Sequence, residues 1–411
     1  MKVRSVTYFA PLTYPFDDKC IAAVGIFLKS ARQALESAGL ETQTLRLATP
    51  PFTEVLGDPS ATHAVDMAQE LEAACAGENI DFLSIGPVIA DRADVPLAPI
   101  YRLPDVLSHT ERVFATVALA SAERGINLAA VQASAEVIRD IARTTSQGFG
   151  TLRFAALANC PPGSPFFPAA YHDGGPPRFA FATEAADLAV TAFSQANTLE
   201  EARRNLVEAF ETAAARLVAV ADQLADEHGL DFGGIDFSLA PFPDPGVSIG
   251  AAIQHLGIDR FGGSGTLFGA AFIINCLRQA SFPRCGYSGL MFPVLEDSVL
   301  AASTEHGMYG IDSLLLYSTV CGAGLDTVPI PGDVSVNELA GILLDVATVA
   351  ITLNKPLSAR LMPVPGLNAD QRTAFDFEYF ANARVLPVKS SGISQLLRQN
   401  QFVSFHQPDE P

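Results

Sequence analysis

Residues 199–241 read LEEARRNLVEAFETAAARLVAVADQLADEHGLDFGGIDFSLAP and join a long helical pattern to a strand. Apolar residues recur every three or four positions, which is one face of a helix, at Leu206, Ala209, Ala213, Leu217, Val220 and Leu224. Gly229 then supplies a residue that favours a helix C-terminus. Beyond it, an apolar strand ends at 237–239 and runs into Ala-Pro-Phe-Pro-Asp-Pro. A helix that leads directly into a strand is the unit of an α/β protein.

The same alternation extends outward in both directions and predicts an α/β fold with helices outside a sheet or barrel. Strands are predicted at 3–9, 42–48, 82–85, 113–119, 152–157, 289–294, 326–330, 358–362 and 384–388. Helices are predicted at 22–38, 63–76, 128–142, 199–228, 249–256, 265–279, 299–305, 313–320 and 336–353. We expect residues 1–389 to form one domain and the polar stretch 390–411 to be a C-terminal tail. The Pro- and Gly-rich stretch 160–177 is predicted to be a long loop with a functional role or poor order.

Composition excludes several classes of function. The 411 residues are 49% apolar and only 17% charged, so the chain can bury a sizeable core. A net charge of −19 would repel a nucleic-acid duplex and an acidic membrane surface, so we expect neither partner. The uncharged run 261–277 is short and rich in glycine, which favours a buried helix over a membrane span. Low charge density and high apolar content predict a homo-oligomer.

The N-terminus has no apolar run followed by a small-residue cleavage site, so we expect a cytoplasmic protein. None of the six cysteines forms a CxxC pair, and in that compartment they would be reduced thiols. No lysine lies between Lys29 and Lys355, which excludes a Schiff-base mechanism in that region. The sequence assigns no cofactor.

Carboxylates at strand ends are candidates for acid–base chemistry. Asp236 and Ser238 alternate with apolar residues and share one strand face, so a buried Asp236 could act as a general acid or base. The alternative is an Asp that caps the next turn. Glu296 and Asp297 follow the 289–294 strand and could do chemistry or cap the next helix. With Asp326 they could also hold a divalent metal ion.

Four other features are weaker candidates. His172, beside Asp173 in a loop, could shuttle a proton or be a plain loop histidine. Gly262-Gly263-Ser264-Gly265-Thr266 enters a helix and could bind a substrate carboxylate or form a tight turn. Cys321 could be a nucleophile or a packing residue. Arg360 and Arg4 could each clamp a carboxylate or phosphate, or make a structural ion pair.

Several ordered segments resemble the DUF711 family, also called UPF0210: RGINLAAV, ANCPPGSPFFPAAYHDGG, GIDFSLAPFP, LGIDRFGGSGT, GYSGLMFPVLED and CGAGLDTVPIPGD. The resemblance implies a closed α/β barrel of about ten strands with surrounding helices, akin to pyruvate formate-lyase. It implies no established activity. The matched polar positions mark a candidate site at Asn159, His172, Asp236, Ser264, Thr266, Glu296, Asp297, Cys321 and Asp326.

The tetrad Arg284-Cys285-Gly286-Tyr287 superficially resembles a glycyl radical signature. That signature belongs near a C-terminus, and Gly286 lies far from the end of this 411-residue chain. We therefore predict a non-radical protein.

We predict an enzyme that acts on a small anionic metabolite inside a barrel cavity. The acid–base candidates are Asp236, Glu296, Asp297 and His172. The candidates for substrate binding are Gly263, Ser264, Gly265, Thr266, Asn159, Cys321 and Arg360. The alternative is a metabolite-binding or regulatory protein, on the same barrel, that catalyses nothing. Either prediction requires distant acidic and glycine-rich segments to meet in one enclosed cavity.

Overall fold

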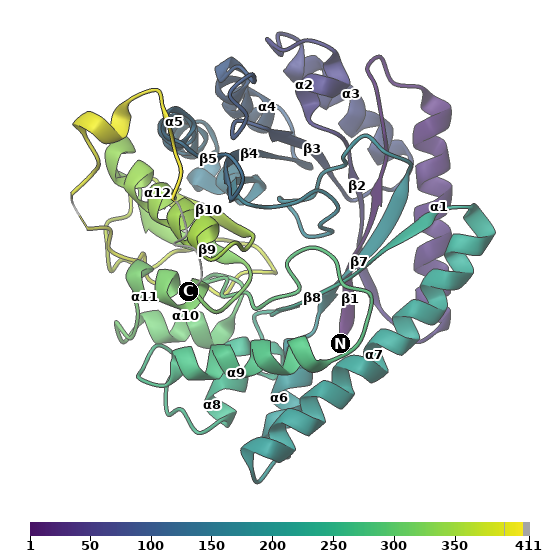
Figure 1. The fold of residues 1–411 in the computed structure, drawn as a ribbon, viewed down its shortest axis with the longest axis vertical. Helices are drawn as coiled ribbons and strands as arrows, with labels where there is room; N and C mark the ends of the chain where they lie inside the picture. The colour runs from purple at the N-terminus through teal and green to yellow at the C-terminus, as the bar shows by residue number, and fades with distance from the viewer. Residues whose placement is uncertain (390, 406–411) are drawn as a thin grey trace.

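A computed structural model describes residues 1–389 and 391–405. One large mixed sheet is surrounded by helices, which lie on its outside (Figure 1). The strands are β1 (Lys2–Phe9), β2 (Thr42–Ala48), β3 (Phe82–Val88), β4 (Val113–Ser121), β5 (Gly125–Asn127), β6 (Phe154–Ala158), β7 (Arg178–Glu184), β8 (Asp231–Ala240), β9 (Gly324–Pro331), β10 (Leu357–Val364) and β11 (Phe402–Val403).

The helices are short to medium in length apart from α1 and α7, which are the longest. They are α1 (Asp18–Ser37), α2 (Phe52–Leu56), α3 (Ala64–Gly77), α4 (Leu103–Ser108), α5 (Leu128–Thr144), α6 (Ala186–Ser194), α7 (Leu199–His228), α8 (Ile249–His255), α9 (Thr266–Gln279), α10 (Ser298–Thr304), α11 (Ile311–Ser318) and α12 (Val336–Thr352). Within the described residues, none of these helices has the length and apolarity needed to cross a membrane.

The sheet consists of a central parallel block with a pair of strands on each side that runs in the opposite direction to the block. Its strand order is β8-β7-β1-β2-β3-β4-β6-β10-β9. Strands β1, β2, β3, β4 and β6 are parallel to one another. Strand β7 is antiparallel to β1, and β10 is antiparallel to β6, while β8 follows β7 and β9 follows β10 in direction. The parallel strands therefore begin at the end of the sheet where β7 to β10 finish.

The predicted closed barrel is not confirmed. The hydrogen-bonded ladder ends at β8 and β9, with no pairing between these two strands in the described part of the chain. The segment 283–294 lies between them and makes only isolated bridges, Ile235 with Arg284 and Pro293 with Asp326. The coarser prediction, an α/β fold with helices outside a sheet, is confirmed.

Most predicted elements match the structure within a few residues, and the exceptions have physical causes. Strand β7 was not predicted, because its sequence RFAFATE directly follows the proline-rich loop. The segment 289–294 forms no strand beyond the Pro293 bridge, since proline cannot donate to a ladder. The segment 384–388 makes only an isolated bridge, between Arg384 and Arg372.

The 160–177 segment, which we call the interior loop, fills part of the space enclosed by the sheet. Its Pro165 carbonyl accepts hydrogen bonds from the Ser5 and Thr7 hydroxyls of β1, at 3.3 and 2.9 Å. Its Ala170 carbonyl accepts a 2.6 Å bond from Ser84 of β3. Residues 164–170 are all buried. The loop is thus an ordered part of the interior, where small inward residues on the strands leave room for it.

The predicted tail is partly described. Strand β11 pairs with the short strand β5, and Phe402 lies opposite Asn127. Residues 390 and 406–411, which belong to the predicted tail, lie outside the described residues.

Candidate functional site

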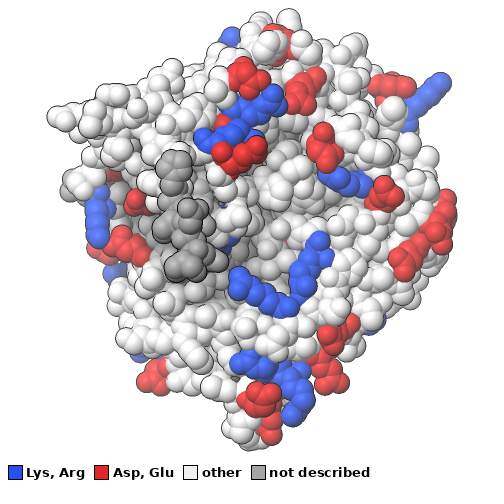
Figure 2. Space-filling view, viewed as in Figure 1, with Lys and Arg blue, Asp and Glu red and all other residues white. Residues whose placement is uncertain are grey.

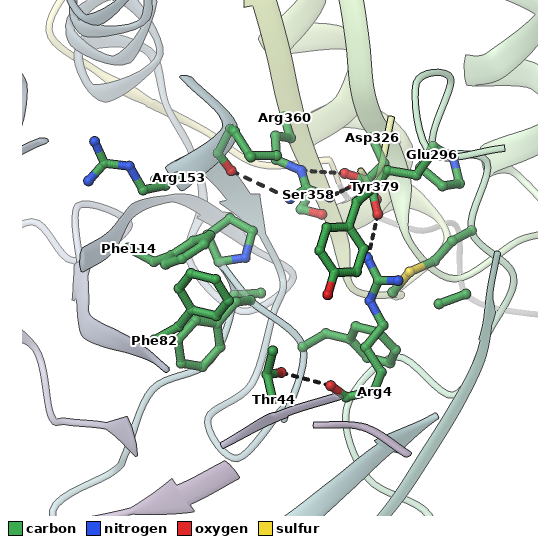
Figure 3. Close-up of a pocket in the computed structure, with 18 of the residues that line it drawn as sticks. Arg4, Thr44, Phe82, Phe114, Arg153, Glu296, Asp326, Ser358, Arg360 and Tyr379 are labelled. Carbon is green, nitrogen blue, oxygen red and sulfur yellow. Dashed lines mark hydrogen bonds and ion pairs between the residues drawn. The ribbon is translucent and has the colours of Figure 1, made fainter. Parts of the chain in front are cut away.

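A cavity of about 390 Å³ lies inside the sheet, at the end where the parallel strands begin (Figure 3). Residues of β1, β2, β3, β4, β8, β9 and β10 line it, together with Phe166 to Ala169 of the interior loop. Phe149, Phe377 and Tyr379 add aromatic side chains from outside the sheet. Figure 2 shows one face of the molecule hollowed near its centre, with Lys and Arg side chains beside the hollow.

Two β-bulges occur where the arginines of the cavity lie. Val3 and Ser5 of β1 pair with adjacent residues of β7, so Arg4 is an extra residue in its strand. In β9, three steps from Leu325 to Val328 match two steps in β10, from Ala359 to Leu361. A bulge re-aims side chains relative to the regular alternation of a strand. The first irregularity therefore helps to direct Arg4 into the cavity, and the second changes how Asp326 of β9 faces Arg360 of β10.

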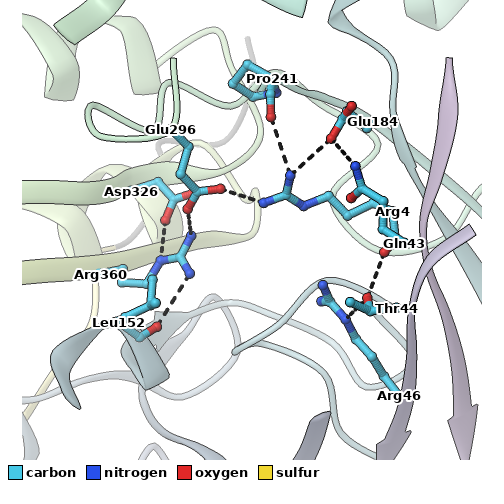
Figure 4. A network of polar contacts seen from close by, with 10 residues as sticks. All are labelled: Arg4, Gln43, Thr44, Arg46, Leu152, Glu184, Pro241, Glu296, Asp326 and Arg360. Carbon is cyan, nitrogen blue, oxygen red and sulfur yellow. Dashed lines mark hydrogen bonds and ion pairs between the residues drawn. The ribbon is translucent and has the colours of Figure 1, made fainter. Parts of the chain in front are cut away.

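Four charged residues form a buried network at one end of the cavity (Figure 4). Arg4 Nη2 lies 2.6 Å from Glu296 Oε2, and Arg360 Nη2 lies 2.9 Å from Glu296 Oε1. Arg360 Nε also lies 2.6 Å from Asp326 Oδ1. All four side chains are at most 14% exposed. Burial alone would lower the pKa of Arg360, but the Asp326 and Glu296 charges outweigh it and raise that pKa.

The other side of Arg4 is also occupied. Its Nη1 lies 3.4 Å from Glu184 Oε2 and donates to the Pro241 carbonyl at 3.4 Å. Gln43 donates a 2.5 Å bond to the same Glu184 oxygen. Burial raises the pKa of Glu184, against the opposing effects of Arg4 and Gln43. Both guanidinium groups of the network therefore have carboxylate partners.

Arg46 differs from Arg4 and Arg360 because it has no carboxylate partner. Its Nε donates a 2.9 Å bond to the Thr44 hydroxyl, and no Asp or Glu of the described chain pairs with it. The residue is buried, with only 8% exposed. Burial, followed by the charges of Arg4 and Arg360, lowers the pKa of Arg46 to about 9. A cation lining a cavity in this environment is poised for an anionic partner.

Aromatic rings surround the Arg46 guanidinium. Its carbon lies 5.0 Å from the Phe167 ring centre and 5.8 Å from that of Phe82. Phe114 packs edge-on against both rings, at centroid distances of 5.3 and 5.5 Å. All three phenylalanines line the cavity, so an apolar wall stands beside the unpaired charge.

Among the acid–base candidates, only Glu296 lines this cavity. Asp236 is fully buried in the wall, where it accepts hydrogen bonds from the backbone N–H groups of Ser238, Tyr287 and Ser288 and from the Ser238 hydroxyl. Burial raises its pKa to about 6, against the effect of those bonds. Asp236 therefore holds the segment after Arg284 against β8.

Asp297 and His172 also make structural contacts. Asp297 caps α10 by accepting from the Val299 and Leu300 N–H groups, and it accepts from the Ser248 hydroxyl at 2.6 Å. His172 Nδ1 accepts from the Gly174 N–H at 2.8 Å, and its Nε2 lies 3.1 Å from the Pro176 carbonyl. Both side chains are fully buried away from the cavity.

The glycine-rich turn, Gly263, Ser264, Gly265 and Thr266, lies outside the cavity. The Gly262 N–H donates to the Thr266 hydroxyl at 3.0 Å, and Ser264 and Gly265 are exposed. The segment is thus a tight turn, which was the alternative to a site for a substrate carboxylate. Asn159 contacts Ala122 and Asn354. Cys321 lines a second hollow. The structure thus brings together Glu296, Asp326, Arg360 and Arg4, and separates the rest from them.

The three carboxylates considered for a metal do not converge, because Asp297 is turned toward α8 and α10. Within residues 1–389 and 391–405, no group of three or more His, Cys, Asp or Glu side chains is placed to hold a metal ion. The residue that sequence reasoning missed is Arg46. In TQTLRLA its polar side chain alternates with Leu45 and Leu47, the same pattern that drew attention to Asp236 and Ser238.

The family model described as Uncharacterised ACR (DUF711) matches residues 1–381. The chain belongs to the DUF711 family. A UPF0210 protein of Pyrobaculum aerophilum is 32% identical to this DUF711 member over 359 residues, which is 83% of this chain and 78% of the relative. A UPF0210 protein of Listeria innocua is 26% identical over 383 residues, 90% and 85% of the two chains. The family resemblance predicted from the motifs is confirmed, and the activity of DUF711 is not established.

Proposed function

We propose that the interior cavity binds a small organic anion and that Arg46 is its principal binding residue. The observation that carries the proposal is the buried Arg46 guanidinium, which has aromatic neighbours and no carboxylate partner in the described chain. An unpaired buried charge is costly, and a bound anion would remove that cost.

The lining favours a monocarboxylate with an apolar body. Arg4 and Arg360 are already paired with carboxylates. Arg153, which also lines the cavity, donates to the Leu107 and Val113 carbonyls. Arg46 is therefore the cavity arginine whose two terminal nitrogens have no hydrogen-bond partner in the described chain. Its two terminal nitrogens match the two oxygens of a carboxylate. Beside it, Phe82, Phe114 and Phe167 offer apolar surface to the remainder of the ligand.

Acid–base catalysis at Glu296 is a second candidate function. Each oxygen of this carboxylate is bound by a different arginine, from strands β1 and β10. An incoming anion that competes for Arg4 or Arg360 would free one Glu296 oxygen beside the ligand. That oxygen would then be placed to accept a proton, which is the role of a general base.

A further proposal concerns the enclosure of the cavity. We propose that segment 283–294 completes a barrel by bridging β8 and β9. The supporting contacts are the Ile235 N–H bond to the Pro283 carbonyl at 2.8 Å and the Val294 N–H bond to the Asp326 carbonyl at 3.1 Å. A ligand would then be enclosed by a continuous wall, as in other barrel proteins with internal sites.

The test is a thermal-shift and calorimetric titration with straight-chain and aromatic monocarboxylates, from acetate to phenylpropionate. Benzoate-sized ligands are expected to raise the Tm of the wild type and of Arg204→Met, a control in which an exposed arginine on α7 is removed. Arg46→Met is expected to lose at least tenfold in affinity. The proposal is wrong if the best ligand binds Arg46→Met as tightly as the wild type, or if no carboxylate binds the wild type.

Catalysis is tested separately, with Glu296→Gln. If Glu296 is the general base, this variant binds the carboxylate and does not convert it, while the wild type releases a product detectable by mass spectrometry. A wild type that binds and never converts the ligand supports the binding protein over the enzyme.

A further inference from the structure

A second hollow, of about 350 Å³, lies on the other side of Tyr287 from the cavity described above. Tyr287 lines both spaces. The second hollow is bordered by the end of α9, by the segment 284–289, by the turn at 320–322 and by Lys355 with Pro356 ahead of β10. None of the residues assigned to anion binding in the first cavity lines it.

The charges around this hollow all have one sign. Arg278, Arg284 and Lys355 line it, and no Asp or Glu does. None of these three cations makes an ion pair with a carboxylate of the described chain. The whole chain has 45 acidic and 26 basic residues, so a concave surface with cations alone is contrary to its overall composition. Arg278 and Arg284 are exposed and solvated, whereas Lys355 is half-buried and loses part of its solvation.

Lys355 holds its ammonium group at the wall of the hollow. Its Nζ donates a 2.8 Å bond to the Ser318 carbonyl, which uses one of its three N–H groups. Burial lowers the pKa of Lys355, and the Arg278 charge acts in the same direction against an opposing effect of Cys321. An anion in the hollow would supply the remaining N–H groups with an acceptor and would offset the repulsion between the two cations.

Arg284 is fixed in place by its own contacts. Its Nη2 donates to the carbonyls at the end of α9, including Leu277 at 2.7 Å, and its guanidinium lies 4.4 Å from the Phe282 ring centre. The N–H groups of Tyr287 and Ser288 are bound by Asp236, and that of Gly289 by Ser238. Recognition of a ligand therefore falls to the cationic side chains and not to the backbone of this loop.

We propose that this second hollow binds a phosphate group, free or carried by a small phosphomonoester. Three cations line the hollow and no carboxylate does, a lining that suits a dianion better than a monocarboxylate. In the first cavity, only Arg46 has terminal nitrogens without a partner in the described chain, which suits a ligand with a single charge. The two sites would thus differ in ligand charge while sharing one tyrosine wall.

The test is calorimetric titration of the full chain with inorganic phosphate and with glycerol 3-phosphate, at constant ionic strength in sodium chloride. Both are expected to bind the wild type. Lys355→Met and Arg278→Gln are each expected to weaken binding at least tenfold. Lys29→Met, which removes an exposed lysine of α1, and Arg46→Met are expected to bind as the wild type does.

Tighter binding of glycerol 3-phosphate than of phosphate identifies a phosphomonoester site, and equal affinities identify a site for the free anion. The proposal is overturned if neither ligand binds the wild type, or if Lys355→Met and Arg278→Gln retain its affinity. Arg278→Gln changes an exposed side chain, so it keeps the test decisive if Lys355→Met fails to fold. Loss of phosphate binding in Arg46→Met alone would also overturn the proposal, by placing the ligand in the first cavity.

Discussion

The Arg46 guanidinium carbon lies 5.0 Å from the ring centre of Phe167, so a cation of β2 rests on an aromatic ring of the interior loop. This contact joins two parts of the chain that are more than a hundred residues apart. It also places against an apolar surface the one cavity arginine whose terminal nitrogens have no hydrogen-bond partner in the described chain. The effect of this arrangement on stability can be measured without knowing the ligand.

Replacing Arg46 by methionine should stabilise the ligand-free protein. The folded environment lowers the pKa of Arg46 to about 9, which means that its charge is disfavoured there at neutral pH. We expect Arg46→Met to raise the free energy of unfolding at pH 7 by about 1 kcal/mol, measured by urea denaturation. The matched variant Arg4→Met should lower it by about 3 kcal/mol, since Glu296 and Glu184 lose a partner. Equal losses in both variants would contradict this account of Arg46.

Breaking the Arg360–Asp326 pair should be strongly destabilising. Arg360→Met leaves a buried carboxylate at Asp326 without its 2.6 Å partner. We expect a loss of about 3–5 kcal/mol in the free energy of unfolding. The double variant Asp326→Asn with Arg360→Met should recover part of that loss, because the unpaired charge is removed. A double variant less stable than the sum of its singles would show that the two residues do not act as a pair.

His172 should make the protein sensitive to mild acid. Burial lowers the pKa of His172 below its usual 6.5, and its Nδ1 already accepts from the Gly174 N–H. As the pH falls below 6.5, His172 becomes protonated in the unfolded chain but stays neutral in the folded chain. The free energy of unfolding therefore decreases as the pH falls below 6.5. The loss can reach at most about 1.4 kcal/mol per pH unit for one group.

The measurement is urea denaturation between pH 5 and 8 for the wild type and His172→Asn, which keeps an acceptor and cannot titrate. The difference in unfolding free energy between the two should change across pH 5 to 6.5 in favour of the variant. A difference that stays constant with pH would show that His172 is not the titrating group.

Thr327 is a site where a smaller residue should help. This buried residue of the β9 bulge has φ at +39°, a conformation that β-branched residues rarely adopt, and its hydroxyl has no hydrogen-bond partner in the described chain. Relief of strain and of the unpaired hydroxyl should outweigh the entropic cost of glycine. We expect Thr327→Gly to raise the free energy of unfolding by about 1 kcal/mol.

The control is Thr116→Gly in β4. Its hydroxyl is also buried and unpartnered, but its backbone is not left-handed. This variant should be destabilised, since glycine weakens an ordinary strand. If both variants lose stability equally in thermal denaturation, strain at Thr327 is not the operative factor.

Much of the fold was predictable, because apolar periodicity and helix signals act locally. The α7 helix was predicted with its bounds, from a three-and-four apolar pattern that ends at Gly229 with φ at +65°. Strand β7 was not predicted because it directly follows a proline-rich segment that indicates a loop. Its Ala180 and Ala182 pack against the interior loop. Whether the sheet closes depends on contacts between segments far apart in the chain, which local patterns do not specify.

The site was predictable only in part, for a similar reason. Glu296 and Asp326 stood out as carboxylates at strand ends, and Arg4 and Arg360 as arginines on strands. These four residues do meet. Asp236 had the same alternating pattern as Arg46, yet its carboxylate is taken up by backbone N–H groups of the loop after Arg284. Which face of a strand receives a loop and which receives a cavity is decided by the tertiary packing. The predicted self-association stays a prediction.

The interior loop has a consequence for how related chains could differ. Phe166 to Ala169 form one wall of the cavity, while the loop is attached to the strands through its own carbonyls, such as Pro165 and Ala170. Those attachments do not depend on the side chains that face the ligand. Substitutions of a few side chains in this loop would therefore change the depth and shape of the cavity and leave the surrounding sheet unchanged.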